Sequence, residues 1–291
     1  MTQYIGVIGY PLKHSLSPYF QQAAFDYYQL DMRYEVWETE PQNLPSAMEQ
    51  LKQPQNTGAN VTVPYKEAVL HFMDDVDDMA KLVGAVNTIV HKDGKLAGFN
   101  TDAHGFLYAL RKDAEFEIKD KSVVILGAGG AARAVSFALL QEGVNSLTIV
   151  NRTTTRSEAL VDSLTRYIAG NRIAAEITAL SWQDSMLREI VQCCHLIVNC
   201  TTLGMKYSPQ EEQSPLSADF IPKGALVYDL VYNPLETPLL RLAKQAGAGI
   251  LGGLPMLVYQ GAAAFKIWTG REAPLDIMLT AAAQALSSSR R

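Results

Sequence analysis

The sequence contains few cysteines, and their positions match neither a disulfide framework nor a metal site. Only three occur among 291 residues, at Cys193, Cys194 and Cys200. An odd number with two adjacent members predicts neither paired cystines nor a zinc knuckle, and the five histidines lack the spacing of metal ligands. We therefore expect buried thiols in a reducing compartment and no bound metal.

Long apolar runs and runs of positive charge are also missing. No stretch of 18 apolar residues occurs, and the first residues have neither the basic region nor the apolar run of a signal peptide. The formal net charge is -5, without a Lys/Arg run of the kind that binds a phosphodiester backbone. We expect a cytoplasmic protein that binds neither membranes nor nucleic acid. An apolar content of 48% is enough for one or two globular cores.

A glycine-rich turn in the middle of the chain is the clearest motif. Residues 122–126 are typical of a buried strand, and residues 131–142 of a helix. Between them lies the segment Gly127-Ala128-Gly129-Gly130-Ala131, which with Ala132 fits the pattern GxGxxA. Glycines at this turn let the backbone approach a pyrophosphate, which the helix N-terminus then attracts. The context of strand, turn and helix predicts a dinucleotide-binding site.

The loop after the next predicted strand, residues 147–150, indicates which dinucleotide binds. An acidic residue at this place would bond the ribose 2′-hydroxyl of NAD. The sequence instead has Asn151, Arg152 and Thr153, followed by Arg156. Guanidinium and hydroxyl groups suit a 2′-phosphate, so we predict NADP.

Strand and helix patterns alternate on both sides of this turn, which predicts helix-covered, mainly parallel sheets. Before the turn we expect strands at 4–8, 33–38 and 58–63, helices at 17–30, 45–52, 65–72 and 102–110, and a hairpin of 86–91 with 96–99 around Asp93-Gly94. After it we expect helices at 156–168 and 238–245 and strands at 196–200, 225–231 and 249–251. Two final helices, 255–268 and 275–286, have no strand between them, so we expect them to pack against an earlier core.

Four segments rich in polar side chains beside glycine or proline lie outside the dinucleotide site. They span residues 9–18, 60–66, 84–88 and 98–102, and we place the first three at or near the C-terminal ends of predicted strands, where open α/β sheets bind ligands. In this order they resemble the shikimate dehydrogenases of the shikimate/quinate dehydrogenase family. Further matches at 199–205, 228–234 and 253–260 extend the resemblance over nearly the whole chain.

The resemblance implies a two-domain α/β fold. Residues 1–103 and 253–291 would form an open, mainly parallel substrate-binding catalytic domain that the C-terminal helices complete. Residues 104–252 would form an inserted Rossmann-like NADP-binding domain. The implied activity is the NADPH-linked, reversible reduction of 3-dehydroshikimate to shikimate, a step of aromatic amino-acid biosynthesis. The implied partner is a small-molecule substrate, and the protein would be a monomer or a homodimer.

By resemblance, Lys66 and Asp102 are the acid–base pair. Hydride reduction of a ketone leaves an alkoxide that needs a proton, and a lysine beside a carboxylate can supply it. Whether the proton passes directly from Lys66 or through Asp102 stays open. Without the resemblance, Lys66 reads as a solvated lysine and Asp102 as a helix N-cap.

The resemblance also assigns substrate contacts. Hydroxyls of Ser15, Ser17 and Tyr232 would bind the substrate carboxylate, although Ser17 before Pro18 also reads as an N-cap. Amides and hydroxyls would bond the ring hydroxyls or hold the catalytic pair, and these come from Asn60, Thr62, Asn87 and Gln260. On the cofactor side, Thr201, Gly253 and Met256 would line the nicotinamide, although Met256 alone reads as a core methionine.

Three residues depart from the family pattern, and two other functions remain possible. Gln22, Pro255 and Tyr259 stand where other residues are usual, and the last two adjoin Gln260. One alternative is a quinate/shikimate dehydrogenase with broader substrate or cofactor use. The other is a non-catalytic NADP-binding regulator, which would need neither Lys66 nor Asp102.

Overall fold

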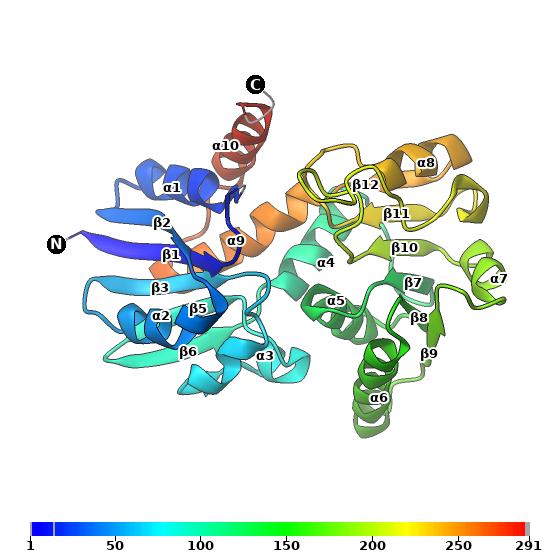
Figure 1. Cartoon of the computed structure of the whole chain (residues 1–291), viewed down its shortest axis with the longest axis horizontal. Helices are drawn as coiled ribbons and strands as arrows, with labels where there is room; N and C mark the ends of the chain where they lie inside the picture. Colours follow the sequence, from blue (N-terminus) through cyan, green and yellow to red (C-terminus); the bar gives the residue numbers. More distant parts are fainter. Residues whose placement is uncertain (1, 14, 289–291) are drawn as a thin grey trace. The chain divides into compact units, whose positions relative to one another are not determined.

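The structure is a computed structural model that describes residues 2–13 and 15–288. Its contacts divide the chain into two compact units, with residues 1–105 and 258–291 in unit 1 and residues 106–257 in unit 2 (Figure 1). The chain thus begins in unit 1, passes through unit 2 and returns to unit 1.

Unit 1 is built on a six-stranded sheet with the strand order β2-β1-β3-β5-β6-β4. Its strands are β1 (Gln3–Gly9), β2 (Met32–Glu38), β3 (Asn56–Val61), β4 (Asp75–Val76), β5 (Thr88–Lys92) and β6 (Lys95–Phe99). All run in one direction except β5, which is antiparallel to both of its neighbours. The sheet is therefore parallel-rich, with one reversed strand near its middle.

A tight hairpin causes the reversal of β5. Asp93 and Gly94 join β5 to β6 with φ angles of 53° and 75°. Two consecutive positive φ values give a turn whose twist matches that of the flanking strands, and Asp-Gly adopts it readily. The hairpin predicted from this dipeptide is confirmed.

The C-terminal helices pack against the first helix of the chain, as expected. Unit 1 contains α1 (Ser17–Tyr27), α2 (Leu44–Leu51), α3 (Asp78–Val83) and α10 (Leu275–Ser288), together with the first residues of α4 (Asp102–Lys112) and most of α9 (Leu254–Thr269). Phe25 of α1 stacks on Phe265 of α9 at a centroid distance of 5.7 Å. A Cβ on Gly261 would lie 2.5 Å from the ring of Phe20, so this close helix contact requires glycine.

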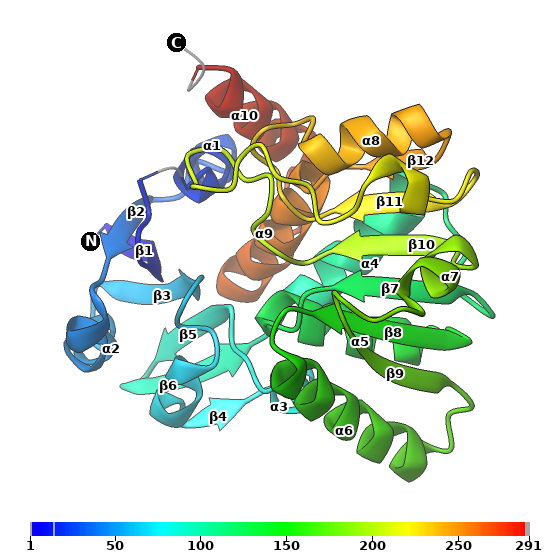
Figure 2. The same cartoon turned by 45° about the vertical axis from the view of Figure 1, so that its right-hand side comes forward.

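Unit 2 is a doubly wound α/β domain, and its parallel sheet is seen openly in Figure 2. The strands are β7 (Ser122–Leu126), β8 (Ser146–Asn151), β9 (Glu176–Ser181), β10 (Leu196–Asn199), β11 (Leu226–Asp229) and β12 (Gly249–Leu251). Their order is β12-β11-β10-β7-β8-β9. The order reverses between β7 and β10, and ligands bind at such a switch point, outside the carboxyl ends of the strands.

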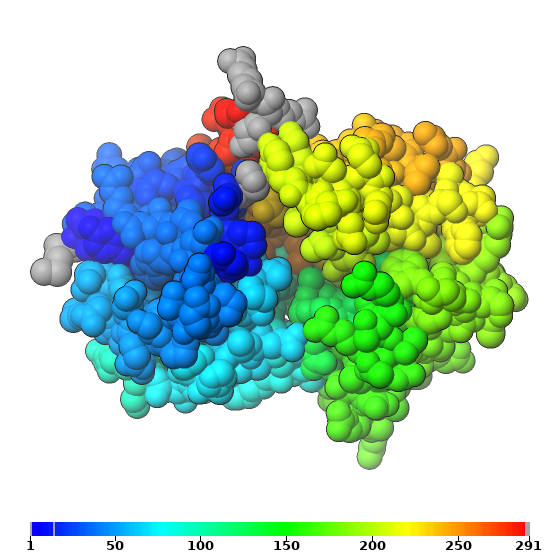
Figure 3. Space-filling model, in the orientation of Figure 1, coloured from blue at the N-terminus to red at the C-terminus, as the bar shows by residue number. Residues whose placement is uncertain are grey.

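Four helices of the described residues lie wholly within unit 2, which also contains most of α4 and the first residues of α9. They are α5 (Gly130–Gln141), α6 (Thr154–Asn171), α7 (Leu187–Gln192) and α8 (Pro238–Ala246). Leu187, Val191 and Leu240 from α7 and α8 share one core cluster with Val124 and Ile197 of the sheet. The C-terminal part of α6 projects from the body of this unit (Figure 3).

The sequence missed several short elements. Strand β9 and helices α3 and α7 were not predicted, and the helix expected at 65–72 is a 3₁₀ helix confined to Ala68–Phe72. Short elements carry too few periods for a hydrophobic pattern to show. In the described part of the chain, no helix is long and apolar enough to cross a membrane.

Candidate active site

Three polar residues meet at one edge of the unit 1 sheet. Asn60 lies near the C-terminal end of β3, and Asp102 follows β6 as the first residue of α4. Asn87 immediately precedes β5, so placing its segment at the C-terminal end of a strand was wrong. Because β5 runs antiparallel to β3 and β6, its beginning lies at the edge where those strands end. The reversal therefore brings Asn87 to the expected ligand-binding edge.

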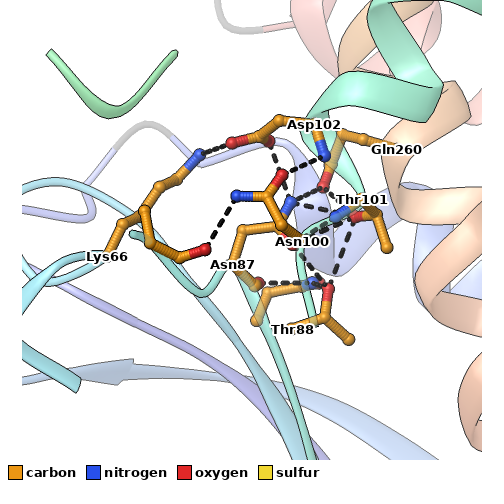
Figure 4. Close-up of polar contacts among 9 residues, drawn as sticks. Lys66, Asn87, Thr88, Asn100, Thr101, Asp102 and Gln260 are labelled. Atoms are coloured by element: carbon orange, nitrogen blue, oxygen red, sulfur yellow. Dashed lines mark hydrogen bonds and ion pairs between the residues drawn. The ribbon is translucent and has the colours of Figure 1, made fainter. Parts of the chain in front are cut away.

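Lys66 and Asp102 form a close ion pair at this edge (Figure 4). The Lys66 Nζ lies 2.5 Å from Oδ2 of Asp102, and the side chains are 20% and 5% exposed. Lys66 occupies a turn after β3, and its carbonyl accepts a hydrogen bond of 2.7 Å from the Val86 amide. The preceding Tyr65 donates its phenol proton to the Thr39 carbonyl at 2.6 Å. Both contacts tie the lysine turn to the rest of unit 1.

Asn87 holds the carboxylate of Asp102 from the opposite side. Its Nδ2 donates to Oδ1 of Asp102 at 2.8 Å and lies 2.9 Å from the Thr101 hydroxyl and 3.2 Å from Oε1 of Gln260. Its Oδ1 accepts from the Thr101 amide at 2.8 Å and from the Thr88 hydroxyl at 3.1 Å. Both ends of the Asn87 amide are therefore occupied within the protein.

Tyr34 of β2 joins two residues predicted to bind substrate. Its phenol donates to Oδ1 of Asn60 at 2.7 Å. The Asn60 Nδ2 lies 3.2 Å from both the Asn87 carbonyl and the Thr88 hydroxyl. Burial raises the pKa of Tyr34, and a hydrogen bond from the Ser17 side chain opposes that rise. Sequence reasoning missed Tyr34 because strand alternation marks it only as an inward-facing aromatic residue.

Three other predicted substrate contacts, Ser15, Ser17 and Thr62, also lie in unit 1. The Ser17 amide lies 3.4 Å from the Ser15 hydroxyl. Ser17 is the first residue of α1, and its cap residue is Leu16, which makes no side-chain cap. The N-cap interpretation of Ser17 was therefore wrong, and its buried hydroxyl contacts Tyr34 instead. Thr62 follows β3, and its amide donates to the Ile8 carbonyl at 2.9 Å.

The glycine-rich turn lies at the switch point of unit 2. Gly127 follows β7 with a φ of 109°, and a Cβ there would lie 3.2 Å from atoms of Cys200 and Thr201. A Cβ on Gly129 would meet no atom within 4 Å, so open space lies beside the N-terminus of α5. Gly129 is the cap residue of this helix, and no side chain caps it. Gly130 and Ala131 open the helix, with Ala128 before them. The arrangement suits a pyrophosphate.

The basic loop begins where β8 ends. The Asn151 Nδ2 donates to the Thr153 carbonyl at 2.9 Å, which shapes the turn into α6. Arg152 and Arg156 are exposed, and neither forms an ion pair with another described residue. Two uncommitted guanidinium groups fit a 2′-phosphate.

Buried polar residues fill the ends of β10 and β11, beside Thr201. Asn199 donates from Nδ2 to Oδ1 of Asp229 at 2.8 Å, and its own Oδ1 accepts from the Thr201 hydroxyl at 2.7 Å. Burial raises the pKa of Asp229 from 3.8 to about 6, against hydrogen bonds from Thr237, Val231 and Asn199. Both Asn199 and Asp229 lie within the matching segments noted in the sequence, but no role was assigned to them there.

Two further residues assigned to the cofactor side are buried. A Cβ on Gly253 would lie 2.2 Å from the Leu230 carbonyl, so glycine is needed here for close backbone packing. Met256 is 7% exposed in α9. Their contact with a nicotinamide stays a prediction.

Comparison with known proteins places this geometry in a family. Three family models match the chain: the shikimate dehydrogenase substrate binding domain at residues 7–89, shikimate / quinate 5-dehydrogenase at 109–201, and the shikimate 5′-dehydrogenase C-terminal domain at 253–283. The chain is 44% identical over 288 residues to the shikimate dehydrogenase (NADP(+)) of Moorella thermoacetica, covering 99% of this chain and 95% of the relative. The chain belongs to the shikimate dehydrogenase family.

Solved structures agree with that assignment. Shikimate 5-dehydrogenase from Thermus thermophilus, in complex with NADP(H) and shikimate, matches with a TM-score of 0.85 and 38% identity, covering 98% of this chain and all of that one. Quinate dehydrogenase from Corynebacterium glutamicum, in complex with NAD, matches with a TM-score of 0.87 and 29% identity, covering 97% and 99% of the two chains. The fold is thus shared by shikimate and quinate dehydrogenases.

The structure accounts for the three departures from the shikimate dehydrogenase pattern. The Gln22 side chain accepts from the Tyr34 amide at 2.9 Å and lies 3.3 Å from the Met32 carbonyl, so it occupies backbone groups on the open edge of β2. Pro255 lies in the first turn of α9, where an amide proton is not needed. Tyr259 is 2% exposed and belongs to the core.

Two remaining expectations concern Tyr232 and metal ions. Tyr232 belongs to unit 2, and burial raises the pKa of its phenol. Its contact with the substrate carboxylate stays a prediction. Among the described residues, no group of three or more His, Cys, Asp or Glu side chains could hold a metal ion.

Proposed function

We propose that this protein catalyses the NADP-linked, reversible reduction of 3-dehydroshikimate to shikimate, on the route to chorismate and the aromatic amino acids. The observation that carries the proposal is the Lys66–Asp102 ion pair, fixed by Asn87 at the ligand-binding edge of unit 1. Membership of the shikimate dehydrogenase family supports the same activity.

Lys66 is the proposed proton donor. NADPH, when bound, supplies the hydride that reduces the substrate carbonyl carbon. The C=O bond electrons then reside on the oxygen, which takes a proton from the Lys66 ammonium group. Lys66 is more exposed than Asp102, whose two oxygens bind Lys66 and Asn87. We therefore assign direct proton transfer to Lys66 and an orienting role to Asp102, with neutral Lys66 as the base in the reverse direction.

The contacts within unit 1 divide the proposed substrate residues by role. The side-chain amide protons of Asn60 and Asn87 are donated to acceptors within the protein. Asn60 would therefore contact the substrate only through its Oδ1, and Asn87 would position Asp102. Thr62 and Gln260 would bond the ring hydroxyls. Ser15 and Ser17 would bind the substrate carboxylate, together with Tyr232.

The proposed cofactor residues follow the switch point of unit 2. Backbone groups of residues 127–131 would hold the pyrophosphate, and Arg152 and Arg156, with Asn151 and Thr153, would bind the 2′-phosphate. Thr201, Gly253 and Met256 would lie on the nicotinamide side. We propose that residues 1–103 and 253–291 serve the substrate and residues 104–252 serve NADP, whereas the compact units meet along the chain a few residues later, after residues 105 and 257.

We also propose that the protein works in the cytoplasm as a monomer or a homodimer. Its three cysteines are free, but Cys193 is exposed, so the expectation of buried thiols was wrong for that residue. Burial raises the pKa of Cys194 to about 12, which keeps this thiol protonated. Free thiols are compatible with a reducing compartment.

The alternative activity is that of a quinate/shikimate dehydrogenase, favoured by the likeness to the NAD-bound quinate dehydrogenase. A matrix of initial rates distinguishes the two: shikimate and quinate, each with NADP⁺ and NAD⁺. We expect the highest kcat/KM for shikimate with NADP⁺. Comparable values for quinate, or for NAD⁺, would contradict the narrow assignment, and no turnover with any pair would favour a non-catalytic regulator.

A further inference from the structure

A chain of hydrogen bonds runs through the buried ends of β10 and β11. Oδ2 of Asp229 accepts from the Thr237 hydroxyl at 2.6 Å. Oδ1 accepts from the Val231 amide at 3.0 Å and from Nδ2 of Asn199 at 2.8 Å. Asn199, Asp229 and Thr237 are all 0% exposed. Bonds among fully buried groups are costly to break, so this arrangement is firmly held.

The donors and acceptors in this series of hydrogen bonds have a fixed direction. An ionised carboxylate only accepts hydrogen bonds, so Asn199 turns its Nδ2 toward Asp229 and its Oδ1 toward Thr201. The backbone supports the same orientation, because the Thr201 amide donates to this Oδ1 at 3.0 Å. The Thr201 hydroxyl also donates to it, at 2.7 Å, so its proton is committed to Asn199. The Leu203 amide donates to the Thr201 hydroxyl at 3.2 Å, which leaves one lone pair.

Thr201 presents that lone pair near the switch point. It follows β10 directly after Cys200, is only partly buried, and lies beside Gly127 of the glycine-rich turn. The nicotinamide ring carries one strong hydrogen-bond donor, the amino group of its carboxamide. An acceptor at Thr201 is complementary to that donor.

We propose that Asp229, acting through Asn199, fixes the Thr201 hydroxyl as a hydrogen-bond acceptor for the nicotinamide carboxamide. This inference rests on the proposed function. Asp229 and Asn199 are positioning residues, and Thr201 makes the contact. These hydrogen bonds thereby favour a cofactor with a carboxamide on its pyridine ring over one with a carboxylate at the same position, because a carboxylate has no proton to donate.

Equilibrium binding by calorimetry tests the proposal without turnover. The ligands are NADP⁺, its nicotinic acid analogue with a carboxylate in place of the carboxamide, and 2′,5′-ADP, which lacks the nicotinamide half. We expect the wild type to prefer NADP⁺ to the analogue. Asn199→Leu removes the acceptor of the Thr201 hydroxyl proton, so the hydroxyl is no longer fixed as an acceptor. NADP⁺ should then bind roughly 3- to 10-fold more weakly, which is the scale of one hydrogen bond. The ratio of the affinities for NADP⁺ and the nicotinic acid analogue should decrease. Binding of 2′,5′-ADP should not change.

Further variants distinguish the loss of the hydrogen-bond acceptor at Thr201 from a general loss of packing. Asp229→Asn can still turn an oxygen toward Asn199 and should keep the preference, whereas Asp229→Leu should lose it. Thr201→Val, a shape-conserving change at a partly buried site, should weaken NADP⁺ as much as Asn199→Leu does. The double variant should add no further loss, since both changes remove one interaction. Asp162→Asn, on an exposed position of α6, is the matched control.

Three results would overturn the proposal: no preference in the wild type, equal weakening of 2′,5′-ADP and NADP⁺ by Asn199→Leu, or loss of the preference in Asp229→Asn. The first two leave the proposed function intact provided that the wild type binds NADP⁺. Failure of the wild type to bind NADP⁺ at all would instead refute the proposed function.

Discussion

Asn87 donates a hydrogen bond of 2.8 Å to the same Asp102 carboxylate that receives the Lys66 ammonium group. The two donors bind different oxygens, so the carboxylate is fixed between them. Asn87 immediately precedes the only reversed strand among the described strands of the unit 1 sheet. The contact between Asn87 and Asp102 thus depends on the direction of one strand.

Replacing Lys66 should abolish most of the turnover. In Lys66→Ala the substrate oxygen loses its proton donor, so kcat should fall by about 100-fold or more, the scale of lost acid–base catalysis. Initial rates with shikimate and NADP⁺ measure the effect. Lys81→Ala, at an exposed lysine of α3 in the same unit, is the control and should retain activity. Little change in kcat for Lys66→Ala would refute the assigned role.

Removing the hydroxyl group of Tyr34 should weaken the binding of shikimate but not that of NADP⁺. Tyr34→Phe leaves Oδ1 of Asn60 and the Ser17 hydroxyl without a buried partner. The KM for shikimate should rise roughly 3- to 10-fold, the scale of one lost hydrogen bond, with a smaller change in kcat. The KM for NADP⁺ should stay constant. Tyr19→Phe, at an exposed tyrosine of α1, is the matched control. Equal changes in both KM values would show a general loss of structure instead.

Replacing Arg152 should affect NADP⁺ far more than NAD⁺. Arg152→Ala removes a charged donor that only the 2′-phosphate needs, so the KM for NADP⁺ should rise roughly 10- to 100-fold. The KM for NAD⁺ should change little. Arg166→Ala removes an arginine charge within α6, outside the basic loop, and serves as the control. Equal effects on both cofactors would mean that the 2′-phosphate binds elsewhere.

Asp229 should make unfolding pH-dependent in a defined direction. Its pKa is raised from 3.8 to about 6 in the fold, so native Asp229 keeps a proton that the unfolded chain releases at lower pH. The group therefore stabilises the fold at low pH, and this contribution is lost as the pH rises through about 6. The neighbouring Cys200 thiol has its pKa raised by burial and by Asp229, so it stays neutral.

The measurement compares urea unfolding of the wild type and Asp229→Asn at two pH values. Relative to Asp229→Asn, the wild type should lose about 1.4 kcal/mol of unfolding free energy between about pH 5 and about pH 7.5. All other titrations cancel in this comparison. A difference that is constant with pH would contradict the raised pKa.

Gln22 illustrates why a departure from a family pattern cannot be interpreted locally. In the sequence it is a polar residue on a predicted helix. In the fold it contacts the backbone of β2 at Met32 and Tyr34, and Tyr34 in turn contacts Asn60. A residue outside the predicted contacts therefore supports one of them, through a strand that follows later in the sequence.

The sequence by itself determined the features that depend on local backbone chemistry. The glycine-rich turn at Gly127, the Asp93-Gly94 hairpin and the basic loop at Arg152 were all predicted from neighbouring residues, because φ preferences and adjacent charges act over a few positions. The tertiary structure decided which side chains share a hydrogen bond. Tyr34 with Asn60, Asn199 with Asp229, and Asn87 with Asp102 are separated by 26, 30 and 15 positions. Strand order and direction bring them together, and both emerge only when the whole sheet forms.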